Sequence, residues 1–215
     1  MDTFNIEALN QILKNAQQIA VVPSTQSGDE SFCAGAGLFY ALKDSGKTAS
    51  FIYTGQVSDR YKDMVEDRDM IKNVETRELF VTVDYSDTPA SKVNYEIENE
   101  KLIFRLGPIS KNFDLNKVTS ELRGYSFDTV IVVGARTQGE VDVIYRELGL
   151  AENNTHVINI DTSLSNTRFG KTNIIDDSKT NLSQLALELV AKTELTLSVN
   201  AAKAFLRGMT YRENA

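Results

Sequence analysis

The chain has 215 residues, of which 41% are apolar and 25% charged, a balance typical of a globular protein rather than a disordered or fibrous one. Its 30 acidic and 23 basic residues give a net charge of −7, which argues against broad binding to nucleic acid or to an anionic membrane. The single cysteine, Cys33, has no partner for an internal disulfide, so we expect a reducing compartment. No run approaches the roughly 18 apolar residues of a transmembrane helix, and no export signal is recognisable. We therefore expect a cytoplasmic protein.

The first part of the chain alternates between two periodicities. Apolar residues recur at helical spacing from Phe4 to Ala16, and a short apolar run closed by Pro23 follows them. A segment rich in alanine and glycine then suits a helix packed closely on a sheet. In chain order, the pattern predicts a helix over residues 4–16, a strand over 19–22, a helix over 32–42, a strand over 48–53, a charged helix over 57–71 and a strand over 79–83.

A change of character occurs at residues 92–106, where apolar and polar residues alternate on both sides of Asn99-Glu100. This pattern predicts a β-hairpin, which we expect to add an antiparallel edge to the sheet. The remaining predicted elements are a helix over 115–122, a nearly all-apolar strand over 129–133, a helix over 141–148, the last strand over 156–160, and helices over 182–190 and 199–206. Together they predict one α/β domain over residues 1–215, with a mostly parallel, doubly wound sheet flanked by helices and an inserted hairpin at about 92–106.

In sheets of this kind, ligands bind at the carboxyl ends of the strands. The loops that follow the predicted strands are polar, and they contain most of the chain's candidate chemistry. We therefore expect a site built from residues 24–30, 84–86, 134–138 and 161–166.

The fourth of these loops contains the most specific motif. An apolar run ends in Asp161, which predicts a buried strand that carries a carboxylate to the loop at its end. Thr162, Ser163, Asn166 and the pair Phe169-Gly170 follow in that order. This order resembles the signature of the DHH phosphoesterases, in which Asn-Ile-Asp-His-His precedes an asparagine and a Phe-Gly pair. The resemblance implies a RecJ-like or oligoribonuclease-like N-terminal DHH domain of bacterial type, with Thr162 and Ser163 in place of its two histidines.

The same resemblance locates the family's other metal ligands. It places Ser24 at a histidine, Gly28 at the first aspartate of that loop, and Glu30 at the second; a shift of one residue would place Asp29 there instead. The next ligand closes the strand over 129–133, where this chain has Gly134. The metal-binding motifs are therefore largely lost, and Asp161 is retained.

These losses affect the chemistry directly. Family catalysis resembles two-metal hydrolysis, in which carboxylates and imidazoles hold Mn²⁺ or Mg²⁺ that activate water. Glu30 and Asp161 are the remaining metal-ligand candidates, and such a pair would bind a divalent ion only weakly. We also expect the C-terminal substrate-binding domain of the family to be absent. We therefore predict a pseudoenzyme with no catalytic residues, no metal and no cofactor, acting as a binding, regulatory or assembly module.

Two alternatives stay open. In the first, Asp29, Glu30 and Asp161, with Asp84 as a further candidate, form a non-standard Mn²⁺ or Mg²⁺ site that hydrolyses nucleotides or short oligonucleotides. In the second, the old cleft binds a nucleotide or phosphate without cleaving it. The residues that would bind such a ligand are Ser24, Gly28, Gly134, Arg136, Thr162, Ser163, Asn166 and Arg168.

Structural roles account for several of the same residues. Asp161 would accept hydrogen bonds from the backbone N–H of Ser163 or Leu164 and so close a turn, and Asp29 and Glu30 would cap the helix that follows them. The same interpretation covers a solvated Arg136 and Arg168, a structural His156 at the wrong end of its strand, and a buried, unreactive Cys33. A protein partner, or a second copy of the chain, would bind the exposed edge of the hairpin.

Overall fold

A computed structural model describes residues 5–86, 90–151 and 153–210, and the chain in it divides into two compact units. The first unit consists of residues 1–77 and 124–215, and the second of residues 78–123. Each unit is described by itself.

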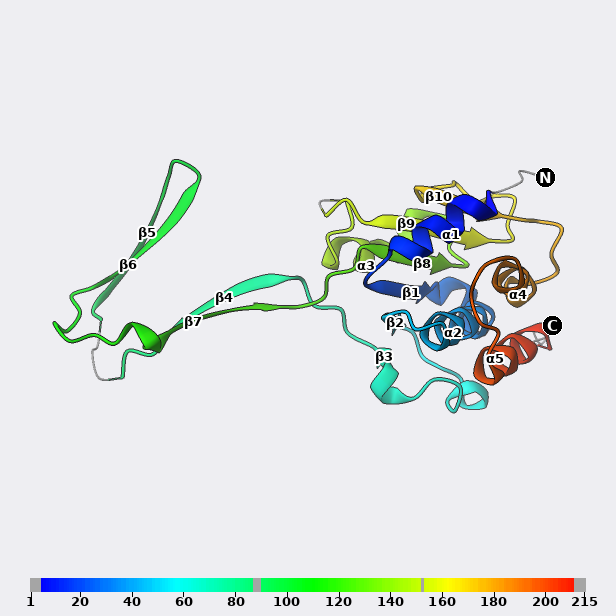
Figure 1. The fold of residues 1–215 in the computed structure, drawn as a ribbon, viewed down its shortest axis with the longest axis horizontal. Coiled ribbons are helices and arrows are strands. Elements are labelled where there is room, and N and C mark those ends of the chain that lie inside the picture. The colour runs from blue at the N-terminus through cyan, green and yellow to red at the C-terminus, as the bar shows by residue number, and fades with distance from the viewer. Residues whose placement is uncertain (1–4, 87–89, 152, 211–215) are drawn as a thin grey trace. The chain divides into compact units, whose positions relative to one another are not determined.

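The first unit is built on a six-stranded sheet, which is parallel throughout (Figure 1). Central strands β1 and β8 are buried along their whole length, as their nearly continuous apolar sequence predicts. In spatial order the strands are β10 (Thr172–Ile175), β9 (His156–Asp161), β8 (Thr129–Val133), β1 (Ile19–Pro23), β2 (Ala49–Ile52) and β3 (Met70–Ile71).

Helices cover both faces of this sheet, which confirms the predicted α/β architecture. Helices α1 (Ile6–Asn15), α2 (Gly28–Asp44), α4 (Leu182–Lys192) and α5 (Val199–Met209) contribute to one apolar core, and α3 (Asp142–Glu147) contributes to the core on the opposite face. Among the described residues, no helix is long and apolar enough to span a bilayer.

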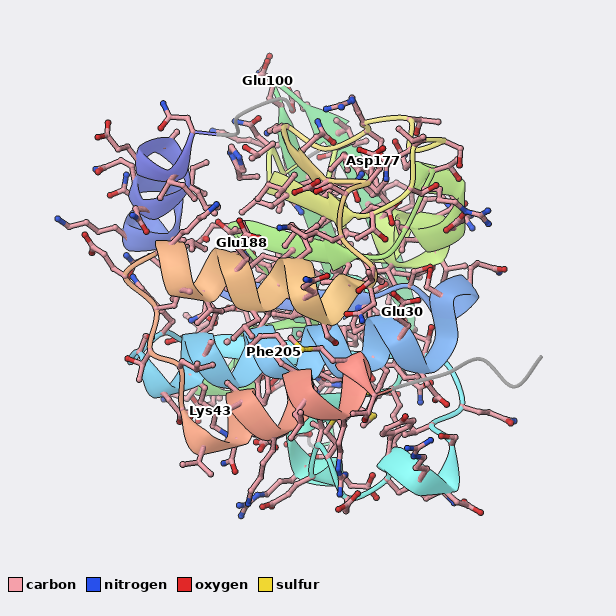
Figure 2. The ribbon with its side chains drawn as sticks, turned by 90° about the vertical axis from the view of Figure 1, so that its right-hand side faces the viewer. Glu30, Lys43, Glu100, Asp177, Glu188 and Phe205 are labelled. Carbon is pink, nitrogen blue, oxygen red and sulfur yellow. The ribbon has the colours of Figure 1, made fainter. Side chains whose placement is uncertain are left out.

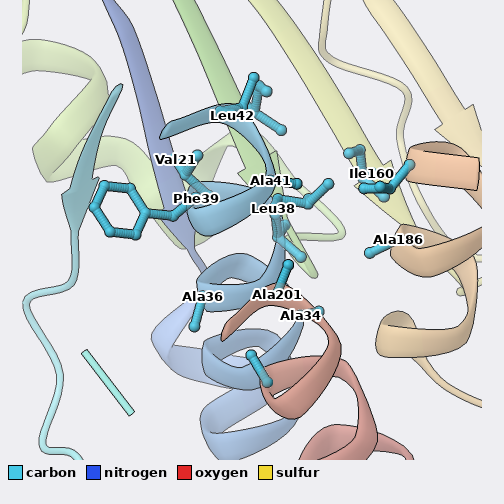
Figure 3. Close-up of a cluster of buried hydrophobic side chains, with 14 of the residues drawn as sticks. Val21, Ala34, Ala36, Leu38, Phe39, Ala41, Leu42, Ile160, Ala186 and Ala201 are labelled. Carbon is cyan, nitrogen blue, oxygen red and sulfur yellow. The ribbon is translucent and has the colours of Figure 1, made fainter. Parts of the chain in front are cut away.

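Helix α2 is the centre of the larger core, and its small side chains let its neighbours approach closely. Ala34, Ala36 and Ala41 are fully buried between α2 and the surrounding elements (Figure 3). At Gly37, an added Cβ would lie 2.2 Å from the ring of Phe205 on α5, whose side chain lies between the two helices in Figure 2. The alanine- and glycine-rich sequence is therefore a packing requirement of this helix.

The second unit consists of two antiparallel ribbons. Strand β4 (Glu78–Val83) pairs with β7 (Val118–Arg123), and β5 (Lys92–Glu98) pairs with β6 (Lys101–Gly107). The predicted hairpin is confirmed. The expectation that it extends the main sheet is wrong, as is the expectation that the strand over residues 79–83 belongs to that sheet. Strand β5 of the hairpin alternates apolar and polar residues, whereas strands central to a parallel sheet are apolar on both faces.

Three other sequence predictions need correction. Residues 57–71 form two short 3₁₀ turns and β3 instead of a helix, and their charged residues make local ion pairs such as Asp59–Lys62. Residues 115–122 form a 3₁₀ turn and β7 instead of a helix, because Val118, Ser120 and Leu122 follow the period of a strand. The strand over 156–160 is not the last one, since β10 follows it.

Candidate functional site

The loops at the carboxyl edge of the parallel sheet are joined by backbone hydrogen bonds. The Ser24 N–H donates to the carbonyl of Val133 at 2.8 Å, and the Gly134 N–H donates to the carbonyl of Ile160, also at 2.8 Å. The loops after β1, β8 and β9 therefore meet, as predicted for three of the four candidate loops. Asp84 instead follows β4 in the second unit, so its expected place at the end of a strand of this sheet is wrong.

Hydroxyl groups hold the first loop in place. Ser24 is fully buried, and its Oγ accepts a hydrogen bond from the Gln26 N–H at 3.2 Å. Ser31 Oγ donates to the Ser24 carbonyl at 2.5 Å, and Ser27 Oγ donates to the Gly134 carbonyl at 2.6 Å. Gly28 then begins α2 with φ +53, a conformation that favours glycine. Serines thus connect this loop to the β8 loop and to the rest of the fold.

Both carboxylates in the first turn of α2 accept hydrogen bonds. Glu30 Oε1 accepts from the Leu182 N–H at 2.9 Å, and Leu182 is the first residue of α4; Figure 2 shows Glu30 beside that turn. Asp29 Oδ2 accepts from Ser58 Oγ at 3.0 Å. Glu30 therefore caps α4 rather than the helix it belongs to, which corrects the predicted role.

Gly134 lies where a side chain has no room. Its φ is +75, and an added Cβ would lie 2.7 Å from Leu182 Cδ1, 3.1 Å from Ser31 Cβ and 3.2 Å from Ser27 Cβ. Contacts that short require the neighbours to move. The position that the resemblance assigns to a metal-binding carboxylate is therefore filled from three sides by packed side chains.

Asp161 is 5% exposed, and both of its carboxylate oxygens accept hydrogen bonds. Oδ1 accepts from the Thr162 N–H at 2.8 Å, and Oδ2 accepts from Asn166 Nδ2 at 2.8 Å. Asp161 therefore holds its loop by hydrogen bonds, as predicted. The donors are Thr162 and Asn166, whereas the backbone N–H groups of Ser163 or Leu164 were expected.

Asn166 connects several segments at this edge. Its Nδ2 also donates to the Ala135 carbonyl at 2.9 Å, and its Oδ1 accepts from Asn159 Nδ2 at 2.9 Å and from the Arg168 N–H at 2.7 Å. The loops after β8 and β9 are thereby fastened together. Sequence reasoning treated Asn166 as a ligand-binding residue and overlooked Asn159, although an amide within an apolar strand was a signal for a buried polar contact.

Arg136 and Arg168, the two arginines of this edge, differ in their local structure. Arg136 Nε lies 3.0 Å from Glu140 Oε1, and the Arg136 N–H donates to the other oxygen of the same carboxylate at 3.1 Å. Arg168 has φ +55 directly after the Asn166 turn. Half-buried Thr162 and Ser163 complete the loop, with the Ser163 hydroxyl paired to that of Ser165 at 2.9 Å. Anion binding by these groups stays a prediction.

The chain's thiol and imidazole lie elsewhere. Burial, together with the charge of Asp29, raises the pKa of the Cys33 thiol to about 12, so it is uncharged at neutral pH and a poor nucleophile. His156 begins β9, at the opposite end of that strand from Asp161, and its Nε2 lies 2.9 Å from Thr172 Oγ1. Within the described parts of the chain, no three His, Cys, Asp or Glu side chains are grouped so as to hold a metal ion.

A depression of about 1030 Å³ is lined by the segment that connects β2 to β3 and by the residues around β3. The sequence did not predict it. Its charged residues pair with one another, as in Lys62–Asp59 and Lys72–Asp67. Ser58 is the link between this depression and the carboxyl edge, through its bond to Asp29.

Comparison with known proteins gives a likeness of fold. No family model matches the sequence, and no similar curated protein is found. Among solved structures, an exopolyphosphatase-related protein from Bacteroides fragilis is similar, with a TM-score of 0.64 and 14% sequence identity. The likeness covers 100% of this chain and 54% of that one, so the chain spans about half the length of its structural neighbour. At this identity the likeness establishes the α/β fold.

Proposed function

We propose that this protein is a phosphoesterase-like protein that has given up metal-dependent hydrolysis and acts as a binding, regulatory or assembly module. The bonds of Asp161 carry the proposal. This carboxylate is the ligand that the DHH-like motif retains, and both of its oxygens accept hydrogen bonds from its own loop. These two bonds give the carboxylate a role in holding its loop.

Two further observations support this function. Gly134 stands where the motif requires another carboxylate, and Leu182, Ser31 and Ser27 occupy the space that its side chain would need. Glu30, the other candidate ligand, accepts the Leu182 N–H and so stabilises the start of α4. Restoring a ligand at residue 134 would therefore require its neighbours to repack as well as a substitution, which favours a structural role for this edge.

A phosphoester hydrolysis panel tests the proposal. Purified protein would be assayed with Mn²⁺ or Mg²⁺ on nucleotide phosphates, short oligonucleotides and polyphosphate. We expect turnover no higher than that of Asp161→Ala, with circular dichroism confirming that both proteins are folded. Metal-dependent turnover that disappears in both Asp161→Ala and Glu30→Gln would overturn the proposal and establish the alternative enzyme with a non-standard site.

A further inference from the structure

The β5–β6 ribbon has one apolar face and one polar face. Its register pairs Val93 with Leu106, Tyr95 with Phe104, and Ile97 with Leu102. Directly paired residues point to the same side of a ribbon. The apolar face of the ribbon therefore consists of Val93, Tyr95, Ile97, Leu102, Phe104 and Leu106.

Five of the six side chains of this apolar face are exposed, and Leu106 is half-buried. Ile97 is 75% exposed, Tyr95 71% and Phe104 55%, whereas hydrophobic side chains of this size are ordinarily buried at least in part. The opposite face contains Glu96 and Arg105, which form an ion pair across the strands, and Ile103 is the one large apolar side chain on it. The polar face is thus suited to water, and the apolar face is not.

An apolar face of this size needs a cover. A two-stranded ribbon is marginally stable by itself in water and gains stability when its apolar face packs against something else. Taking about 150–250 Å² for each large exposed side chain, the exposed part of the face is on the order of 700 Å², near the roughly 800 Å² that each partner contributes to an interface of standard size. The face is therefore large enough to bind a protein.

We propose that the apolar face of the β5–β6 ribbon packs against the same face of a second copy of this chain. Two-fold association places a surface on itself, so a self-complementary surface is required. This face meets that requirement, because it carries no charge that would repel its copy and its Tyr95–Phe104 pair supplies aromatic groups typical of the centre of an interface. The charged residues of the ribbon lie on the other face and stay in water.

The second ribbon repeats the pattern. Leu79, paired with Leu122, and Val81 share one face of β4–β7, with Leu79 65% and Leu122 61% exposed. Both ribbons of the second unit thus leave apolar surface uncovered, while the first unit has two buried cores of its own. Self-association of this unit deepens the assembly role proposed above, but it is tested by molecular mass rather than by activity, so either proposal can fail alone.

Light scattering after size exclusion tests the proposal with a matched pair of variants. At about 100 µM, where an interface of this area is expected to form, the full chain should have twice its 23.9 kDa mass. Tyr95→Glu should be monomeric, because it buries a charge in the interface. Asn94→Glu places the same charge on the adjacent residue, which faces the other way, and should stay dimeric.

Cysteine cross-linking provides a second test that does not depend on weakening the ribbon. The native Cys33 is buried, so an introduced cysteine would be the reactive one. Under mild oxidation, Tyr95→Cys at the centre of the face should give a disulfide-linked dimer, whereas Asn94→Cys on the polar face should not.

Several results would overturn the proposal. A monomeric wild-type chain would mean that another part of the chain or a different protein covers the face. A dimer that persists in Tyr95→Glu would place the interface elsewhere. A mass that grows beyond the dimer would exclude closed two-fold packing.

Discussion

Strands β8 and β5 differ in sequence pattern and in what their apolar side chains contact: β8 is apolar along nearly its whole length, and β5 alternates apolar with polar residues. Every residue of β8 is buried, between α-helices on both faces of the sheet, whereas β5 has an apolar face that is exposed and a polar face opposite to it. In the first unit, apolar side chains stabilise the unit's own fold. In the second, most of them are exposed, on the ribbon face that we propose as a dimer interface. Four measurements can test this difference, and the first should give the largest effect.

The same substitution, phenylalanine to alanine, should change the free energy of unfolding much more in the first unit than in the second. Phe51 is fully buried under α2, and Phe51→Ala should lower the free energy of unfolding by about 3–5 kcal/mol. Phe104→Ala should cost the first unit less than about 0.5 kcal/mol. Circular dichroism in urea measures this, because all the α-helices in the described residues belong to the first unit and the chain has no tryptophan.

The two variants should be compared at protein concentrations too low for the proposed dimer to form. Dissociation of a dimer then contributes nothing to the difference between their free energies of unfolding. Equal destabilisation of the helical signal by both substitutions would contradict the separation of the two units.

The packed carboxyl edge should behave like the core. Gly134→Ala combines a positive φ with a Cβ that meets Leu182, Ser31 and Ser27, while Gly46→Ala combines a positive φ with open space. We expect Gly134→Ala to cost about 1–3 kcal/mol more than Gly46→Ala, from overpacking. The pair is compared by urea unfolding, and equal costs would show that the edge is loosely packed.

Asn166 should contribute to stability without any metal. Asn166→Ala removes the amide that bonds Asp161, Ala135 and Asn159, and should cost about 1–3 kcal/mol. Thermal unfolding with EDTA and with Mn²⁺ should give the same difference from wild type. A cost that appears only with Mn²⁺ would assign these groups to a metal site. Ser165→Ala, in the same loop, is the control and should have a small effect.

The smallest effect concerns pH. Burial, with the nearby charge of Lys171, lowers the pKa of His156 in the folded state below its usual 6.5. The unfolded chain therefore takes up a proton first as pH falls, and stability decreases below about pH 6.5. His156→Gln should flatten this part of the stability–pH curve, as measured by urea unfolding between neutral and mildly acidic pH. An unchanged slope would show that His156 is solvated.

The sequence predicted the main sheet better than the connections between its strands. Continuous apolar runs such as that of β8 identified the buried strands, because burial on both faces leaves a strong pattern. For residues 57–71 the same approach predicted the wrong element. Their apolar residues have helical spacing, but the segment forms 3₁₀ turns and β3, with local ion pairs near Tyr61 such as Asp59–Lys62. Which sheet a strand joins is a tertiary property, and β4 has no local feature that distinguishes the two outcomes.

The sequence predicted where the candidate site residues lie on the sheet, but it did not predict their hydrogen-bond partners. The rule that strand ends collect functional groups located Asp161 and Gly134 correctly at one edge. Glu30 capping α4 depends on a contact between residues 30 and 182, and such a distance along the chain leaves no local signal. The role of Asn159 is similar, because it follows from the position of Asn166 in the folded loop.

In the function proposed above, the carboxylates of this edge hold loops rather than a metal ion. Calorimetric titration of the full chain with Mn²⁺ at pH 7.5 measures whether they bind one, with Asp161→Asn as the matched control. We expect no stoichiometric binding and identical traces for the two proteins. Tight binding of one or two ions per chain that is lost in Asp161→Asn would contradict the claim.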